Sequence, residues 1–395
     1  MSLKADITAR LRSIAETMRR LGWGALVVTS PEAVQYFSGA LIHTQALIRR
    51  RQATVVITQD SKAVLIVAAV EKALAARLSL LDSLDTYDEF ESSACAAAGA
   101  LLRSRIDANA TIAIEKTHLP AVDFECLSAL LPLASFVAGD DILAEMRIAK
   151  SADELDAVAF VASVMDEAIS TAVGRTVAGL TEVALANDIT CIALQLGGGR
   201  IRDAIGLVAA GPNLRVSHHV AGSSPIKSGD VLRVGCRATC DGYHGLVART
   251  AAVGELLPPV ERRYASLVEA HRDLRASLDI GASGGDIYAR ASLTRRSLGL
   301  TLETSHVGHG IGLEFQEPPR LRSGSTDTLK QDSTLMAVSV LNDPDVGHLY
   351  IEDMVAIRPD GCFLLSSSTG TDSILPLWVG TKPTSAAGGT GLSAH

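Results

Sequence analysis

The stretch LRVGCRATCDGYHGLVARTAAVGE, residues 232–255, decides the fold class of the second half of the chain. Within it, two runs rich in valine, alanine and threonine flank the turn residues Asp241 and Gly242. Two such runs around a short turn are typical of neighbouring antiparallel strands. Further strand-like runs lie at TLMAVSVL (334–341) and YIEDMVAI (350–357), and helices are expected at 152–173, 181–196, 258–278 and 284–298. The second half is therefore predicted to be α+β, with a largely antiparallel sheet.

The first 145 residues alternate strand-like and helix-like segments. The strand-like runs are GALVVTS (24–30), ATVVITQ (53–59), AVLIVAA (63–69) and TIAIEK (111–116). The helical stretches between them are expected at 7–21, 71–81 and 94–104. This alternation predicts a mixed α/β domain. No glycine-rich phosphate loop follows any of these strands, so the pattern does not favour nucleotide binding.

The boundary between the two domains is expected near EMRIAKSADELDAV, residues 145–158. There Ser151 can cap the helix that follows, and Glu154, three residues on, completes a capping box. The predicted divisions are an N-terminal domain at 1–145, a second domain at 146–381 and a Gly-, Ala- and Ser-rich tail at 382–395. The composition of the tail predicts that it is disordered.

The chain carries a formal net charge of −8 and has a sequence pI near 5.7. Nucleic acids and anionic membranes attract basic surfaces, so neither is expected as a main partner. Six cysteines spread over 395 residues do not form the dense framework of a disulfide-rich secreted domain. The N-terminal segment resembles an amphipathic helix rather than a signal peptide, and no run of about 18 apolar residues predicts a membrane span. A cytoplasmic protein is expected.

Six segments of the chain follow one another in the order in which a known family carries them. They are VQYFSGA (34–40), RIAKSADELDAV (147–158), GPNLRVSHH (211–219), DGYHGLVARTAAVGE (241–255), GHGIGLEFQEPPRL (308–321) and YIEDMVAI (350–357). Together they resemble the creatinase/prolidase/methionine aminopeptidase superfamily. The resemblance implies an α/β N-terminal domain and an α+β C-terminal pita-bread domain, a curved antiparallel sheet backed by helix pairs. It also implies a homodimer in which the N-terminal domain of one subunit lies near the partner's site.

Most members of that superfamily bind two divalent metal ions through Asp, Asp, His, Glu and Glu. Carried over position by position, the resemblance places these ligands at Gly235 (or Arg233), Leu246, His309, Val338 and Glu352. One imidazole and one carboxylate remain, too few for two divalent cations or one zinc ion. We therefore expect no metal and no other cofactor. Cys236, Cys240 and His244 do not replace the lost ligands, because residues four apart on a strand lie about 13 Å apart.

Creatinase is the precedent in this superfamily for hydrolysis without metal, and its acid/base histidine matches His218. A histidine titrates near neutral pH, so His218 can take a proton from water and return it to a leaving amine. The adjacent His219 leaves the choice between the two open, and a neutral histidine held in a loop is the alternative. Arg320, eleven residues after His309, matches an arginine that binds the substrate carboxylate in creatinase. A surface arginine is the alternative there.

The remaining expected substrate-binding residues are hydrogen-bonding groups. They are His309, Glu352, His306, Gln316 and His244. An ionised Glu352 suits a cationic or amide N–H group because a carboxylate only accepts hydrogen bonds, and pairing with a buried cation is its alternative. Gln316 stands where related proteins have a histidine, and His306 is a candidate to compensate for it. A contribution of Arg49–Arg51 to anion binding across a dimer is a further expectation.

The expected function is hydrolysis of a C–N bond of the amide, amidine or guanidino type, without metal. The substrate would be a small molecule bearing a carboxylate, with His218 as the acid/base group. Two alternatives stay open. One is a non-catalytic binding protein that descends from a peptidase, and the other is a diverged Xaa-Pro peptidase.

Overall fold

The computed structural model describes residues 3–175, 178–301, 304–344, 346–366 and 371–377. The chain divides into two compact units, Met1–Asp156 and Ala157–His395. The division falls inside helix α8 (Ala152–Arg175), whose first turn has the predicted capping box. The Ser151 amide donates to Glu154 Oε2 at 2.8 Å, and the Glu154 amide donates to Ser151 Oγ at 3.4 Å. The tail predicted to be disordered lies outside the described residues.

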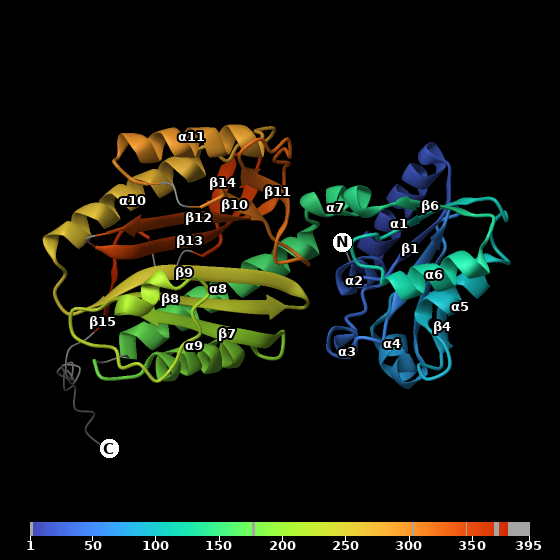
Figure 1. Ribbon diagram of the computed structural model, residues 1–395, viewed down its shortest axis with the longest axis horizontal. Coiled ribbons are helices and arrows are strands. Elements are labelled where there is room, and N and C mark those ends of the chain that lie inside the picture. Colours follow the sequence, from blue (N-terminus) through green and yellow to red (C-terminus); the bar gives the residue numbers. More distant parts are fainter. Residues whose placement is uncertain (1–2, 176–177, 302–303, 345, 367–370, 378–395) are drawn as a thin grey trace, which may run out of the picture. The chain divides into compact units, whose positions relative to one another are not determined.

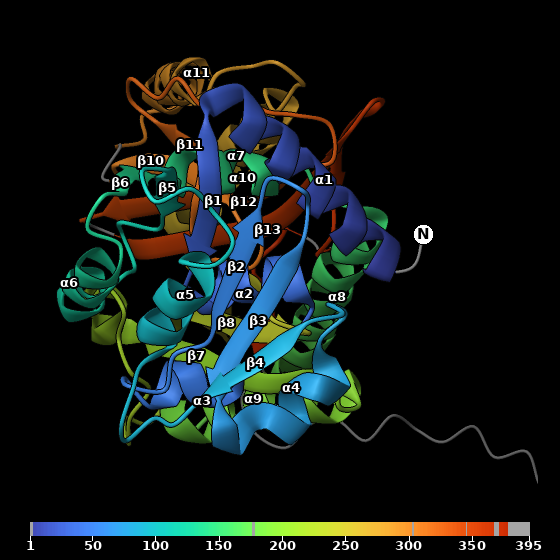
Figure 2. The same ribbon diagram turned by 90° about the vertical axis from the view of Figure 1, so that its right-hand side faces the viewer.

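The first unit is an α/β domain around a six-stranded sheet, as the alternating pattern predicts. Its strands are β1 (Trp23–Val28), β2 (Thr54–Thr58), β3 (Ala63–Ala68), β4 (Leu84–Tyr87), β5 (Thr111–Ile114) and β6 (Ser135–Ala138). They lie in the order β4-β3-β2-β1-β5-β6, and Figure 2 shows β1 to β4 side by side. Its helices are α1 (Leu3–Leu21), α2 (Pro31–Ser38), α3 (His43–Leu47), α4 (Lys72–Leu78), α5 (Ala94–Leu102), α6 (Ala121–Leu130) and α7 (Asp140–Ile148).

The core of this unit forms where α5 and α6 pack on the sheet. Val27, Ile66 and Ile112 of the central strands are buried against Ala98 of α5 and Leu127 of α6. Burial of such aliphatic side chains stabilises a fold by about 1.5–3 kcal/mol each. This packing forms the hydrophobic core of the first unit.

The second unit is built on a nine-stranded sheet. Its strands are β7 (Ile201–Ala210), β8 (Val231–Cys240), β9 (Tyr243–Val253), β10 (His306–Gly310), β11 (Glu317–Arg322), β12 (Thr334–Asp343), β13 (Gly347–Arg358), β14 (Gly361–Leu364) and β15 (Leu375–Leu377). The main path runs β11-β10-β12-β13-β9-β8-β7, with every neighbouring pair antiparallel. The predicted turn at Asp241 and Gly242 joins β8 to β9. The antiparallel sheet predicted from the sequence is therefore confirmed.

Four helices cover one face of this sheet, which we call the outer face (Figure 1). They are α8, α9 (Glu182–Gly197), α10 (Pro258–Ala276) and α11 (Gly284–Ser297). Helix α9 packs so closely on β7 that a Cβ at Gly206 would lie 2.0 Å from the carbonyl oxygen of Ala186. At the other half of the sheet, Leu335 of β12 and Val355 of β13 pack with Leu274 of α10. The opposite face, which we call the inner face, is not covered by these helices.

A buried network of charges joins the outer face to its helices. Arg249 of β9 lies 2.7 Å from Asp353 of β13 and 3.6 Å from Asp166 of α8. His271 of α10 contacts the other oxygen of Asp353 at 2.9 Å. Although burial opposes ionisation, the neighbouring Arg249 and His271 hold the pKa of Asp353 at about 2. The network therefore fixes which face of each strand points outward.

Helix α8 is long and apolar enough to cross a membrane by length and composition alone. Its most apolar window is 61% buried inside the fold, as in the core helix of a soluble protein. Val161 and Met165 of this helix would meet a Cβ placed on Gly245 of β9. The apolar composition of α8 is therefore accounted for by its packing on the sheet.

Candidate active site on the inner face of the sheet

Strand register aligns four residues in one row across the second sheet. Gly235 of β8 pairs with Ala248 of β9, which pairs with Glu352 of β13, which pairs with Val338 of β12. Directly opposed residues of antiparallel strands carry their side chains on the same face. Because the residues that follow Ala248 and Glu352 belong to the outer-face network, this row points to the inner face.

The other two positions of interest flank this row. Leu246 is two residues from Ala248 on β9, so its side chain points to the same face. His309 of β10 pairs with Met336, which is two residues from Val338 on β12. The fold therefore places all five positions that the resemblance assigns to metal ligands on the inner face, whichever residues occupy them.

The residues present do not fit a pair of divalent cations. Glu352 and His309 can coordinate, whereas Gly235, Leu246 and Val338 supply no donor atom. Within the part of the chain that the structure describes, no group of three or more His, Cys, Asp or Glu side chains is placed to hold a metal ion. The donor set is thus one carboxylate and one imidazole where a two-metal site needs several anionic oxygen ligands.

The two neighbouring histidines after η2 (Gly211–Arg215) occupy different environments. His219 Nε2 lies 2.9 Å from Oε2 of the fully buried Glu182. Glu182 also accepts hydrogen bonds from the Ala210 amide at 2.7 Å and from Asn213 Nδ2 at 3.0 Å. His219 therefore anchors this loop to helix α9 through its contact with Glu182.

His218, in contrast, is exposed, and its backbone adopts a left-handed conformation with φ of 57°. Its imidazole has no hydrogen-bond partner among the described residues. A positive charge on His218 opposes the rise that burial causes in the pKa of Glu352. Because one histidine is committed to Glu182 and the other is not, the geometry favours His218 as the chemically available residue of the pair.

Glu352 is the half-buried carboxylate of the site. Burial raises its pKa, and the positive charges of Arg233, Arg249 and His218 oppose that rise. No described side chain donates a hydrogen bond to its carboxyl group. A buried carboxyl group without a partner is costly, so Glu352 is placed to receive a donor from a ligand.

A cluster of aromatic rings lies around His309. The His309 ring centroid is 5.6 Å from that of His306 and 6.0 Å from that of Phe315, which is in turn 6.0 Å from His244. His309 Nδ1 donates to the Gly310 carbonyl at 2.9 Å, and burial lowers the pKa of His309 to about 4. Burial also lowers the pKa of His306 and of His244, and Nδ1 of each is buried with no partner among the described residues. These are neutral rings with unused hydrogen-bonding atoms.

The remaining residues expected to bind the substrate are either exposed to solvent or paired with a carboxylate. They are Gln316, Arg320 and the Arg49–Arg51 run. Gln316 is exposed, in the bend between β10 and β11. The Arg320 side chain is 53% exposed, and its guanidinium lies 3.8 Å from Asp327, although its backbone pairs with His309. Arg51 makes two hydrogen bonds to Glu89, at 2.8 and 2.7 Å, and also contacts Glu71, while Arg49 and Arg50 are exposed.

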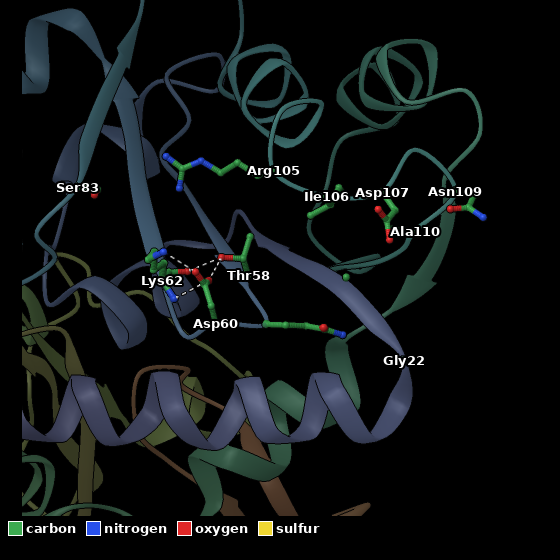
Figure 3. Close-up of a pocket in the computed structure, with 12 residues that line it drawn as sticks. Gly22, Thr58, Asp60, Lys62, Ser83, Arg105, Ile106, Asp107, Asn109 and Ala110 are labelled. Atoms are coloured by element: carbon green, nitrogen blue, oxygen red, sulfur yellow. Dashed lines mark hydrogen bonds and ion pairs between the residues drawn. The ribbon is translucent and has the colours of Figure 1, made fainter.

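A large cavity of about 970 Å³ lies elsewhere, on the first unit (Figure 3). Its lining includes Asp60 and Lys62, which form an ion pair at 2.7 Å, and Thr58, which donates to Asp60 at 2.6 Å. Arg105 and Asp107 of its rim are exposed. Because its charged groups are paired or solvated, this cavity does not present the unpartnered groups that the inner face does.

Comparison with known sequences agrees with this geometry. The sequence model of metallopeptidase family M24 matches residues 154–359, and that of the creatinase/prolidase N-terminal domain matches residues 10–149. The chain belongs to metallopeptidase family M24. It therefore has the two-domain organisation of a family of hydrolases, and its second unit has the pita-bread fold.

Individual relatives cover most of this M24 chain. The Xaa-Pro dipeptidase of Pyrococcus horikoshii is 24% identical over 247 residues, which are 62% of this chain and 70% of the relative. The probable dipeptidase PepE of Mycobacterium tuberculosis is 26% identical over 383 residues, covering 94% and 98% of the two chains. The crystal structure of dipeptidase PepE from Mycobacterium ulcerans superposes with a TM-score of 0.81 at 22% identity, covering 96% and 99%.

Two residues of this M24 site, Arg233 and Tyr350, were not predicted from the sequence as ligand-binding residues. Arg233 counted only as a possible lost ligand, yet its charge is the first to oppose the raised pKa of Glu352. Tyr350, two residues before Glu352, lies with its ring under the Arg233 guanidinium at 5.1 Å. The sequence held a usable pattern for both residues. Arg233 is a charged residue between apolar neighbours on its strand. Tyr350 lies two residues before Glu352, so the side chains of these two residues point to the same face of the strand.

Proposed function

We propose that this chain hydrolyses a C–N bond of a small, carboxylate-bearing molecule of the amide class, without a divalent metal ion and with His218 as the acid/base group. The observation that carries the proposal is the contrast between the two sets of groups on the inner face. Three of the five ligand positions cannot coordinate a cation, whereas His218 and Glu352 interact electrostatically and lack hydrogen-bond partners among the described side chains.

The chemistry follows from these two groups. His218 takes a proton from water while the water oxygen forms a bond to the carbonyl or amidine carbon. The resulting tetrahedral intermediate collapses as the C–N bond breaks, and the imidazolium returns its proton to the leaving nitrogen. Glu352, when ionised, accepts a hydrogen bond from a substrate N–H and orients it, because a carboxylate without a proton is an acceptor only.

The test is a comparison of turnover by the whole protein and two variants, with a panel of Xaa-Pro dipeptides, other small amides and guanidino acids. His218→Asn should lower kcat by about 10²- to 10⁴-fold, the usual contribution of a positioned acid/base group. His219→Asn, at the histidine committed to Glu182, should retain kcat and lose stability. Equal turnover by the wild type and His218→Asn would contradict the proposal.

A diverged Xaa-Pro dipeptidase is a second candidate, and the comparisons favour it. A relative named as a probable dipeptidase is 26% identical to this chain and matches over 98% of its own length. The donor set counts against the metal-dependent form of that reaction, because only Glu352 and His309 carry a donor atom at the five ligand positions, and no group of three or more candidate ligands is placed to hold a metal ion among the described residues. Turnover of Xaa-Pro dipeptides that appears only on addition of Mn²⁺ or Co²⁺ would favour this candidate over the first.

A non-catalytic binding protein is the remaining alternative. Its signature would be saturable binding of a dipeptide or small amide without turnover, together with unchanged binding in His218→Asn. Turnover of any member of the panel by the wild type, together with loss of that turnover in His218→Asn, would exclude a non-catalytic binding protein.

A further inference from the structure

Arg233 projects onto the inner face from β8. Its neighbours Leu232 and Val234 are fully buried, whereas Arg233 is half-buried. It pairs with Thr250 of β9, whose hydroxyl donates to the Tyr350 carbonyl at 3.0 Å and accepts from the Tyr350 amide at 2.8 Å. The register thus places Arg233 two pairs along from the row that contains Glu352, on the same face of the sheet.

The guanidinium of Arg233 is held in place from one side. Its carbon lies 5.1 Å from the centroid of the Tyr350 ring, within the range of a cation–π contact. Tyr350 is itself 7% exposed, and its hydroxyl lies 3.4 Å from the Leu214 carbonyl, to which it donates. The ring therefore acts as a rigid support that limits the conformations of the arginine.

The positive charge of Arg233 is not neutralised within the described structure. Its Nε atom is buried and has no hydrogen-bond partner, and no described carboxylate forms an ion pair with it. The other arginines that point from these central strands are paired, Arg237 with Asp203 at 3.2 Å and Arg249 with Asp353 at 2.7 Å. A half-buried guanidinium without an anion pays a desolvation cost that a bound anion would offset.

Arg233 and Glu352 are close enough to interact but are not paired with each other. Arg233 is the first of the charges that oppose the raised pKa of Glu352. Two strand spacings and two residues of rise separate their backbones, which is roughly 12 Å in a flat sheet. A small molecule with a carboxylate at one end and an N–H group near the other fits between two such groups.

We propose that Arg233 binds the carboxylate of the substrate, with its guanidinium fixed by Tyr350, while Glu352 accepts a hydrogen bond from the substrate N–H. This assignment rests on the proposed function for the identity of the ligand as a substrate. It gives the carboxylate role to Arg233 rather than to Arg320, which is largely exposed and lies beside Asp327. A positive group thus stands where the resemblance allows an aspartate, so the inner face selects an anion.

The test uses acetate as the probe and acetamide as its uncharged isostere. Acetate added to the whole wild-type protein should shift the NMR resonance of the Arg233 Nε–H group in a saturable way, and acetamide should not. Arg233→Met and Arg233→Lys both remove this resonance and so assign it. Arg233→Met should weaken acetate binding by about tenfold or more. Because this variant lacks the Arg233 resonance, its affinity is measured from the acetate-induced shifts of other inner-face residues.

The matched control is Arg237→Met, four residues along the same strand and already paired with Asp203. It should leave the affinity for acetate unchanged. Arg233→Lys, which keeps the charge and preserves the fold more readily, should bind acetate with intermediate affinity. Absence of a saturable acetate shift in the wild type, or equal binding by wild type and Arg233→Met, would overturn the assignment.

Failure of the proposed function gives a different result from failure of this assignment. His218→Asn should keep the acetate response of the wild type whether or not the protein turns over a substrate. A saturable shift at Arg233 without turnover of any amide would remove the hydrolase proposal and leave Arg233 as an anion-binding residue. Turnover with no acetate response at Arg233 would keep the hydrolase proposal and remove Arg233 as the residue that binds the carboxylate.

Discussion

Glu352 and Asp353 are consecutive residues of β13, yet their carboxyl groups lie on opposite faces of the sheet and have opposite pKa shifts. Burial raises the pKa of Glu352 on the inner face. On the outer face, Arg249 and His271 hold the pKa of Asp353 at about 2 despite its burial. A strand that alternates its side chains thus separates a carboxylate that stabilises the fold from one that has no hydrogen-bond partner among the described side chains.

Glu352→Gln is expected to stabilise the protein at neutral pH while it lowers activity. A carboxyl group whose folded pKa is raised costs no stability below its ordinary pKa, and the cost grows as pH rises through the folded pKa. The neutral amide removes that cost, so Tm should rise by a few degrees at pH 7 and change little at pH 4. Thermal unfolding at both pH values measures this. A lower Tm at pH 7 would contradict the raised pKa.

Asp353→Asn is expected to destabilise the protein by about 3–5 kcal/mol, because it leaves Arg249 buried without its nearest anion. Asp372→Asn is the matched control, since Asp372 pairs with Arg272 at 2.7 Å but both side chains are more than half exposed. That variant should change stability by less than about 1 kcal/mol. Urea unfolding of both variants gives the comparison, and equal losses would refute the role of the buried network.

His309 is expected to make the protein less stable as pH falls from about 6.5 to about 4, since burial lowers its folded pKa to about 4. In that range the unfolded chain takes up a proton that the folded protein excludes, so stability falls with pH, by up to about 3 kcal/mol for this one group. His309→Asn should flatten the dependence of the unfolding free energy on pH over this range. An unchanged slope in the variant would show that other groups are responsible.

Leu246→Asp combined with Val338→Glu is expected to create affinity for divalent cations. Val338 belongs to the row that contains Glu352, and Leu246 lies two residues from that row on the same face. The double variant would therefore bring three carboxylates and His309 to the inner face. Calorimetric titration with Mn²⁺ should give saturable binding in the double variant and none in the wild type. Gly235→Asp is the poorer choice, because a Cβ there would lie 2.8 Å from the Val247 carbonyl oxygen.

The sequence predicted the main strands and helices because their apolar patterns are local. Runs such as 53–59 and 334–341 are β-branched and bounded by turns, and both are strands in the structure. Strands β4 and β6 were among those not predicted, because LDTY and SFVA are short, mixed in polarity and at the edges of their sheet. Edge strands need less apolar character than central ones, so composition indicates them poorly.

The candidate site was only partly predictable for a different reason. Motif spacing located His309 and Glu352, but the choice between His218 and His219 depended on Glu182, which lies 37 residues from His219 in the sequence. The pairing of Arg51 with Glu89 likewise joins residues 38 positions apart. Such contacts follow from tertiary structure and leave no local pattern, and the same holds for the support of Arg233 by Tyr350.

The most direct test of metal-free hydrolysis is the metal content and turnover of the purified protein after dialysis against a strong chelator. Substrate from the amide panel is then supplied in metal-free buffer, and bound metal is counted by mass spectrometry. Metal-free hydrolysis predicts substoichiometric metal and a kcat that the chelator leaves unchanged. One or two tightly bound metal ions per chain, with turnover lost on chelation and restored by Mn²⁺ or Co²⁺, would contradict it.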